Sequence, residues 1–169
     1  MPQRYFFIVN PKSGAHGRAD IVRLLHDRLR ERGDIVDISL TQSLNHAADL
    51  ASNVRLKNYH TIIIAGGDGT VRSVAGAMAG SDIPLLILPT GTENLLAGEL
   101  GLDGSLETTI NTLDNGLIRR LDLGQTGNRF FISVAGIGFD AEVIRRLNII
   151  RFGHITHTCL LYTSDAADE

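Results

Sequence analysis

Cysteine is almost absent from this sequence, because Cys159 is the only one among 169 residues. A single thiol excludes an intramolecular disulfide, and it also excludes the paired CxxC motifs that bind structural zinc. Disulfide frameworks are common in small secreted domains. Their absence here favours a reduced, cytoplasmic location.

Long hydrophobic runs are also missing. The apolar stretch at the start, Tyr5 to Val9, is far shorter than the roughly 20 residues of a membrane span. It is also too short for the apolar part of a signal peptide, and it ends in a turn at Asn10-Pro11. We therefore expect no transmembrane segment, so that any contact with a membrane would be peripheral.

There is no excess of positive charge. The chain has 16 basic and 19 acidic residues, whereas nucleic-acid binders carry a basic patch or stripe. Nucleic acid is therefore not an expected partner. The composition, 43% hydrophobic and 21% charged, is that of a globular protein and argues against disorder.

The end of the chain differs from the rest. Residues 159–169 read CLLYTSDAADE and resemble a translated sequencing-library adapter. On this interpretation the natural protein is longer and its gene was cut near Thr158. The alternative is a genuine C-terminal helix.

Apolar runs and helical periods alternate along the rest of the chain. The runs 5–9, 35–40, 60–65 and 85–88 predict strands. Between them, apolar residues at helical spacing predict helices around 21–29, 45–54 (with Asn45 as N-cap) and 71–78. This alternation predicts an α/β fold, a three-layer domain with a parallel sheet. Two short helices near 94–100 and 105–113, strands at 119–123 and 129–135, and a helix from about Asp140 should follow.

Polar, glycine-rich loops follow three of the predicted strands. They are Asn10–Gly14, Gly66–Thr70 and Pro89–Asn94. In a parallel sheet, ligands bind where the strands end at their carboxyl edge. We therefore expect the three loops to face a common cleft.

The loop Gly66-Gly67-Asp68-Gly69-Thr70 is the most informative of the three. Its glycines let backbone amides turn toward a ligand, and Thr70 would open a helix whose amino-terminal amides favour phosphate. Asp68 would be repelled by phosphate unless a metal ion or a transferable proton stood between them, which is a requirement of Mg²⁺-nucleotide chemistry. The alternative is a tight turn with a helix cap.

Other phosphate motifs are absent or weak. The sequence contains no GxxxxGK[ST], so a Walker-type site is excluded. Residues 136–141 fit the dinucleotide pattern GxGxx[GA], but that pattern is weak by itself. Lys12 in the first loop could contact phosphate or be a solvated turn residue.

Four segments in order, NPKSG, AGGDGTV, LPTGTENLLA and LDLGQTGNRFFISVAGIGFDAEV, resemble the diacylglycerol kinase catalytic-domain family, which includes sphingosine kinases and bacterial lipid kinases. The resemblance implies an amino-terminal domain like that of NAD kinases and phosphofructokinases, with ATP between the three loops. It implies nucleotide contacts at Asn10, Ser13, Gly14, Gly66, Gly67, Gly69, Thr70, Gly91 and Thr92. Asp68 would organise the metal and phosphates or deprotonate the lipid hydroxyl. The third loop, PTGTENL, departs from the family's usual PxGTGND.

The resemblance also implies a domain organisation and a function. Residues 1–118 would form the nucleotide-binding domain, 119–158 the start of a β-rich lipid-binding domain, and 159–169 a non-native tail. The expected activity is ATP- and Mg²⁺-dependent phosphorylation of a diacylglycerol-like or sphingoid hydroxyl at the membrane surface, with this chain incomplete for catalysis. A NAD kinase-like enzyme and a non-catalytic nucleotide-binding fragment are the alternatives. No motif sets an oligomeric state.

Overall fold

The computed structural model describes residues 2–13, 19–133, 135–136, 138–139, 141–143 and 146. The chain divides into two compact units, Met1–Ser133 and Val134–Glu169, and each is treated by itself. Gly14, Asp140 and the predicted tail at 159–169 lie outside the described residues. The domain boundary predicted at residue 118 stays a prediction.

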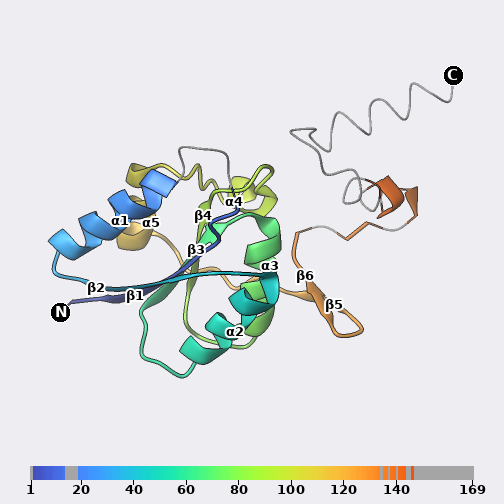
Figure 1. Ribbon diagram of the computed structural model, residues 1–169, viewed down its shortest axis with the longest axis horizontal. Helices are drawn as coiled ribbons and strands as arrows, with labels where there is room; N and C mark the ends of the chain where they lie inside the picture. Colours follow the sequence, from blue (N-terminus) through green and yellow to red (C-terminus); the bar gives the residue numbers. More distant parts are fainter. Residues whose placement is uncertain are drawn as a thin grey trace, which may run out of the picture. The chain divides into compact units, whose positions relative to one another are not determined.

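The first unit is built on a four-stranded parallel sheet (Figure 1). Its strands are β1 (Arg4–Val9), β2 (Ile35–Leu40), β3 (Thr61–Gly66) and β4 (Leu85–Pro89), in the spatial order β2-β1-β3-β4. All six residues of β3 are buried, as expected for a central strand covered on both faces. The predicted parallel α/β fold is confirmed.

The connections between the strands are helical. Helix α1 (Ala19–Glu31) joins β1 to β2, α2 (Leu44–Val54) joins β2 to β3, and α3 (Asp68–Ala77) joins β3 to β4. The α2 connection passes over β1, so the strand order reverses between β1 and β3. Such a switch point, at the carboxyl ends of the strands, is where open α/β sheets bind ligands.

Helices cover both faces of the sheet (Figure 1). Alternate β1 residues face opposite ways. Phe6 and Ile8 pack in the cluster with α2, α3 and α4 (Leu95–Glu99), whereas Tyr5 and Phe7 pack with α1 and α5 (Leu106–Asn115). Phe7 is fully buried, so truncating it to alanine would cost about 3–5 kcal/mol.

Two helices begin at different residues from those predicted. Helix α2 is capped by Ser43, whose hydroxyl oxygen accepts the N–H of His46 at 3.1 Å; the predicted cap, Asn45, lies inside the first turn. Helix α3 begins at Asp68 with Gly67 as its N-cap, not at Thr70. The acidic residue therefore belongs to the first turn of α3.

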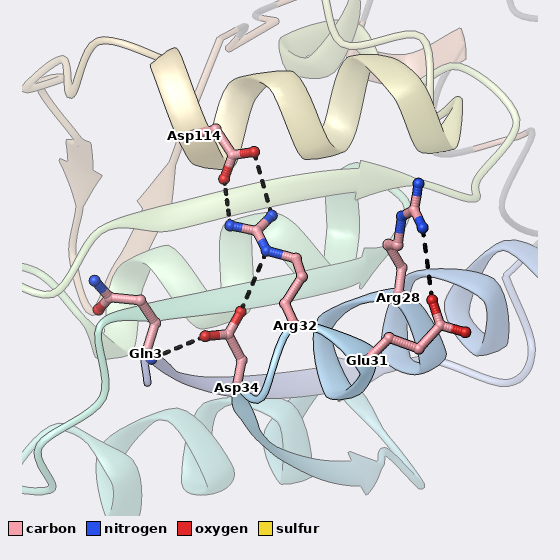
Figure 2. Close-up of polar contacts among 6 residues, drawn as sticks. All are labelled: Gln3, Arg28, Glu31, Arg32, Asp34 and Asp114. Carbon is pink, nitrogen blue, oxygen red and sulfur yellow. Dashed lines mark hydrogen bonds and ion pairs between the residues drawn. The ribbon is translucent and has the colours of Figure 1, made fainter. Parts of the chain in front are cut away.

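An ion-pair cluster joins several elements at the amino-terminal edge of the sheet (Figure 2). Arg32, just after α1, donates hydrogen bonds of 3.2 and 2.6 Å to the carboxylate of Asp114 on α5. On its other side it lies 3.7 Å from the carboxylate of Asp34, which also accepts the backbone N–H of Gln3 at 2.9 Å. Elsewhere in this view, Arg28 and Glu31 pair at 3.5 Å on the exposed face of α1.

The segment after α5 departs from the sequence prediction. The strand predicted at 119–123 is wrong, because residues 116–123 form no regular element. The strand predicted at 129–135 begins at the expected residue but is shorter: β6 spans Arg129–Phe131 and pairs antiparallel with β5 (Gly124–Thr126), which was predicted as a turn. Leu117 and Ile118 are 86% and 78% exposed, because no described strand pairs with them. Phe130 packs against Gly76 of α3, where an added Cβ would lie 2.9 Å from its ring.

In the second unit, the backbone is helical at Phe139, at 141–143 and at Arg146. Among the described residues, no helix has both the length and the apolar character needed to cross a membrane.

Candidate functional site

The three glycine-rich loops lie at the same edge of the sheet, because they follow the neighbouring strands β1, β3 and β4. Backbone hydrogen bonds join them. The N–H of Asn10 donates to the carbonyl of Ala65 at 2.8 Å, and the N–H of Thr90 donates to that of Gly66 at 3.2 Å. The structure therefore brings together the described residues to which the resemblance assigns a site: Asn10, Ser13, Gly66, Gly67, Asp68, Gly69, Thr70, Gly91 and Thr92.

Thr70 fixes the turn from β3 into α3. Its side chain is 2% exposed and covers Gly66, where an added Cβ would come within 2.7 Å of the Thr70 Cβ. The Thr70 hydroxyl oxygen accepts a 3.1 Å hydrogen bond from the Asn10 amide nitrogen, and the Asn10 amide oxygen accepts the backbone N–H of Lys12 at 3.0 Å. Both ends of the Asn10 side chain thus bond to the protein itself.

The β3 and β4 loops touch backbone to backbone. A Cβ added to Gly91 would lie 2.5 Å from the Gly67 Cα, and one added to Gly67 would lie 3.2 Å from the Gly91 Cα. Distances under about 3 Å are sterically forbidden for real side chains, so Gly91 has a packing requirement for glycine. This contact brings the amides that follow Gly91 beside the start of α3.

Asn94 closes the β4 loop. It adopts a left-handed conformation with φ 52° and ψ 48°, which asparagine tolerates better than most residues. Its side-chain oxygen accepts the N–H of Gly91 at 2.9 Å, and its side-chain nitrogen donates to the Gly91 carbonyl at 2.7 Å. Thr92 and Glu93, at the tip of the loop, are exposed.

A residue absent from the predicted set, Thr90, also belongs to this edge. It is 4% exposed, and its hydroxyl oxygen lies 2.8 Å from that of Ser13. Its sequence signals are its place directly after a buried strand and its position within the third glycine-rich loop.

The start of α3 has the properties of a phosphate-binding site. The helix begins without a side-chain cap, and the first amides of any helix lack partners within the helix. The Thr70 and Val71 amides donate to the Gly67 carbonyl. At Gly69 an added Cβ would meet only the Leu44 side chain, at 3.7 Å. Packing within the described protein therefore does not require a glycine at Gly69, whereas an approaching phosphate would.

Asp68 lies between these glycines and is half-buried. Among the described residues, none gives its carboxylate a hydrogen bond or an ion pair. The described part of the chain also holds no group of three or more histidine, cysteine or acidic residues able to bind a metal. Mg²⁺ commonly takes one or two carboxylates and completes its shell with water and substrate phosphates. One carboxylate beside the amino-terminal amides of a helix fits that pattern.

A cavity of about 700 Å³ opens elsewhere, at the amino-terminal edge of the sheet. It is lined by residues such as Gln3, Arg4, Tyr59 and Pro84, and by none of the predicted site residues. The loops at the carboxyl edge remain the candidate site, because glycine backbone, a helix start and a carboxylate without a partner among the described residues meet there.

The fold and these loops together define a parallel α/β domain with glycine-rich loops at the carboxyl ends of three neighbouring strands. Among known protein families, the sequence profile of the diacylglycerol kinase catalytic domain matches residues 4–126 of this chain. This chain belongs to that family. The matched range contains the whole parallel sheet and all three loops.

Individual relatives agree with the family match. The chain is 34% identical over 157 residues to a diacylglycerol kinase of Mycobacterium tuberculosis, covering 87% of this chain and 50% of the relative. It is 31% identical over 139 residues to a diacylglycerol kinase of Bacillus subtilis, covering 80% and 46%. A crystal structure of a diacylglycerol kinase from Bacillus anthracis superposes with a TM-score of 0.64 at 25% identity, covering 76% of this chain and 48% of that one. The chain thus spans about half the length of these relatives.

Proposed function

We propose that the three loops bind the phosphates of ATP, and that the protein transfers the terminal phosphoryl group to a lipid hydroxyl. The observation that carries the proposal is the start of α3, where Asp68 stands between Gly67 and Gly69 against the β4 loop. Its position at the sheet's switch point supports a ligand there. The names of the relatives, diacylglycerol kinases, support a lipid as the acceptor.

In this proposal, backbone amides bind the phosphates and the Asp68 carboxylate acts on the metal ion or on the lipid hydroxyl. The Asp68 and Gly69 amides at the start of α3 and the amides that follow Gly91 would hold phosphate oxygens, since the contact between Gly67 and Gly91 places them beside each other. Mg²⁺, when bound, neutralises charge on the transferring phosphoryl group. Asp68 would bind that ion or accept the proton of the lipid hydroxyl, and both roles require its negative charge.

The side chains of Asn10 and Thr70 have a different role in this proposal. Because they bond to each other, they would fix the β1 loop against α3 and leave nucleotide contacts mainly to backbone groups. The acceptor side would come from the β-rich part that the resemblance places after residue 118. A diacylglycerol-like or sphingoid lipid at the membrane surface is the acceptor that we propose.

Calorimetric titration of this chain with ATP and MgCl₂ tests the nucleotide site. We expect wild type to bind ATP, with Mg²⁺ strengthening the binding, and Asp68→Asn to lose most of that Mg²⁺-dependent gain. Asp49→Asn is the matched control, because Asp49 is exposed on α2 and away from the three loops. Absence of ATP binding by the wild-type chain would overturn the proposal.

A transfer assay tests the acceptor. A form of the protein that includes the β-rich part would be incubated with γ-labelled ATP and with diacylglycerol, sphingosine or NAD. Label in a lipid product is the expected result. Label in NAD alone would identify a NAD kinase-like enzyme, and binding of ATP without any transfer would identify a nucleotide-binding module.

A further inference from the structure

A chain of hydroxyl groups joins the β1 loop to the end of β4. The Ser13 hydroxyl donates to the Asn10 carbonyl at 2.8 Å, and its oxygen also lies 2.8 Å from the Thr90 hydroxyl oxygen. A hydroxyl has one proton to donate. Because Ser13 donates its proton to Asn10, Thr90 must be the donor to Ser13.

This hydrogen bond connects strands that are not neighbours. β3 lies between β1 and β4, so the Ser13–Thr90 bond spans the carboxyl end of β3. Thr90 follows Leu88 by two residues, and Leu88 packs with α1 and α5; alternation along the strand therefore places Thr90 on that face. Asn10 follows Ile8, which packs with α2 and α3, so the Asn10–Thr70 bond lies toward the opposite face.

The β1 loop is therefore held at two points, one on each side of the sheet. The backbone N–H of Thr90 also donates to the Gly66 carbonyl, and Thr90 immediately precedes Gly91, which touches Gly67. Thr90 thus belongs to the β4 loop and bonds to both the β1 loop and the end of β3.

We propose that Thr90 and Ser13 are positioning residues for the nucleotide site. Their hydrogen bond fixes the β1 loop relative to Gly67 and Gly91, so that the phosphate-facing backbone groups are in place before ATP binds. The role rests on the proposed function, since it concerns the same three loops. Preorganisation of this kind raises affinity because less ordering is left for the binding step.

The test compares Thr90→Val, which keeps the shape and removes the hydroxyl, with Thr90→Ser, which keeps the hydroxyl. The control is Thr109→Val on α5, because Thr109 is also 4% exposed and also donates its hydroxyl proton, to the Ser105 carbonyl at 2.7 Å. We expect Thr90→Val to weaken Mg²⁺-ATP binding about tenfold, the equivalent of one net hydrogen bond. Thr90→Ser should stay within about threefold of wild type, and Thr109→Val should lower only the melting temperature.

Hydrogen exchange without nucleotide separates this inference from the proposed function. In the ligand-free chain, Thr90→Val and Ser13→Ala should both speed amide exchange at Lys12 and Ser13, whereas Thr109→Val should not. If wild type binds no ATP, the proposed function fails, but this exchange measurement still tests the hydrogen bond. The inference is overturned if Thr90→Val matches Thr109→Val in ATP affinity, or if exchange in the β1 loop is unchanged. Should Thr90→Val fail to fold, Ser13→Ala and Thr90→Ser decide the question by the same two readouts.

Discussion

The guanidinium group of Arg32 donates two hydrogen bonds to the carboxylate of Asp114, 82 residues further along the chain. The same group lies 3.7 Å from the Asp34 carboxylate (Figure 2). The two partners differ in burial, since Asp114 is 38% exposed and Asp34 only 7%. One oxygen of Asp34 is buried without a hydrogen bond, so the positive charge of Arg32 is its main compensation.

Arg32→Met should destabilise the protein more than Asp114→Asn. The methionine keeps an unbranched side chain but leaves the buried Asp34 charge uncompensated, which we expect to cost on the order of 2 kcal/mol or more. The Asp114 pair is partly exposed and should contribute less than about 1 kcal/mol. Urea denaturation of the two variants measures both effects. Equal losses would show that Asp34 does not depend on Arg32.

Gly91→Ala should disrupt the site because its Cβ would lie 2.5 Å from the Gly67 backbone. Forcing the β3 and β4 loops apart should cost about 1–3 kcal/mol and abolish detectable ATP binding. Gly98→Ala is the control, since a Cβ there meets nothing within 4 Å and helix α4 should accept alanine. Thermal unfolding and calorimetric titration of both variants test the idea, which fails if Gly91→Ala binds ATP like wild type.

Asp68→Asn should abolish most turnover in a catalytically active form that includes the β-rich part. The substitution keeps the size of the side chain and removes the charge needed at the metal or at the lipid hydroxyl. Loss of such a group commonly lowers the rate by a factor of about a hundred or more. Initial rates with diacylglycerol measure the effect, and circular dichroism checks the fold. A rate within about threefold of wild type would exclude this role for Asp68.

Asp37 should make folding stability dependent on acidic pH. The hydrogen bond from the Tyr59 hydroxyl, 2.8 Å long, and the ion pair with Arg4 lower the pKa of Asp37 in the folded protein. Its contribution is therefore present above the unfolded pKa of about 3.9 and is lost as pH falls through the lower folded pKa. The stability difference between wild type and Asp37→Asn should shrink as pH is lowered from about 6 toward about 3. A difference that does not change with pH would contradict this linkage.

Much of the first unit could be predicted from hydrophobic patterns. The continuous apolar run that became β3 indicated a central strand, and the alternation of runs with helical periods indicated a parallel sheet. Apolar residues alone misled after α5, because Leu121 and Leu123 suit a strand by type but no described strand pairs with them. A strand needs a neighbour, and a single sequence does not show one.

The site was predictable at the level of loops but not of contacts. Glycines around Asp68 marked the β3 loop, yet nothing local indicated that Gly67 and Gly91 would touch. Thr90 was missed because its partner, Ser13, is 77 residues away. The cap of α2 was misplaced at Asn45 because Ser43 and Asn45 both favour that role, and only the geometry distinguishes them.

Because the connection through α2 passes over β1, the site can form only after strands far along the chain have joined the sheet. The hydrogen bonds that hold the β1 loop reach residues 60 and 77 positions later, and loops of that length must close before either bond forms. A growing chain that has β1, β2 and β3 but not β4 would lack half of these restraints. The β1 loop would thus lack part of its support until β4, the last strand of the four-stranded sheet, has formed. Competence to bind ATP should therefore emerge in one late step of folding rather than gradually.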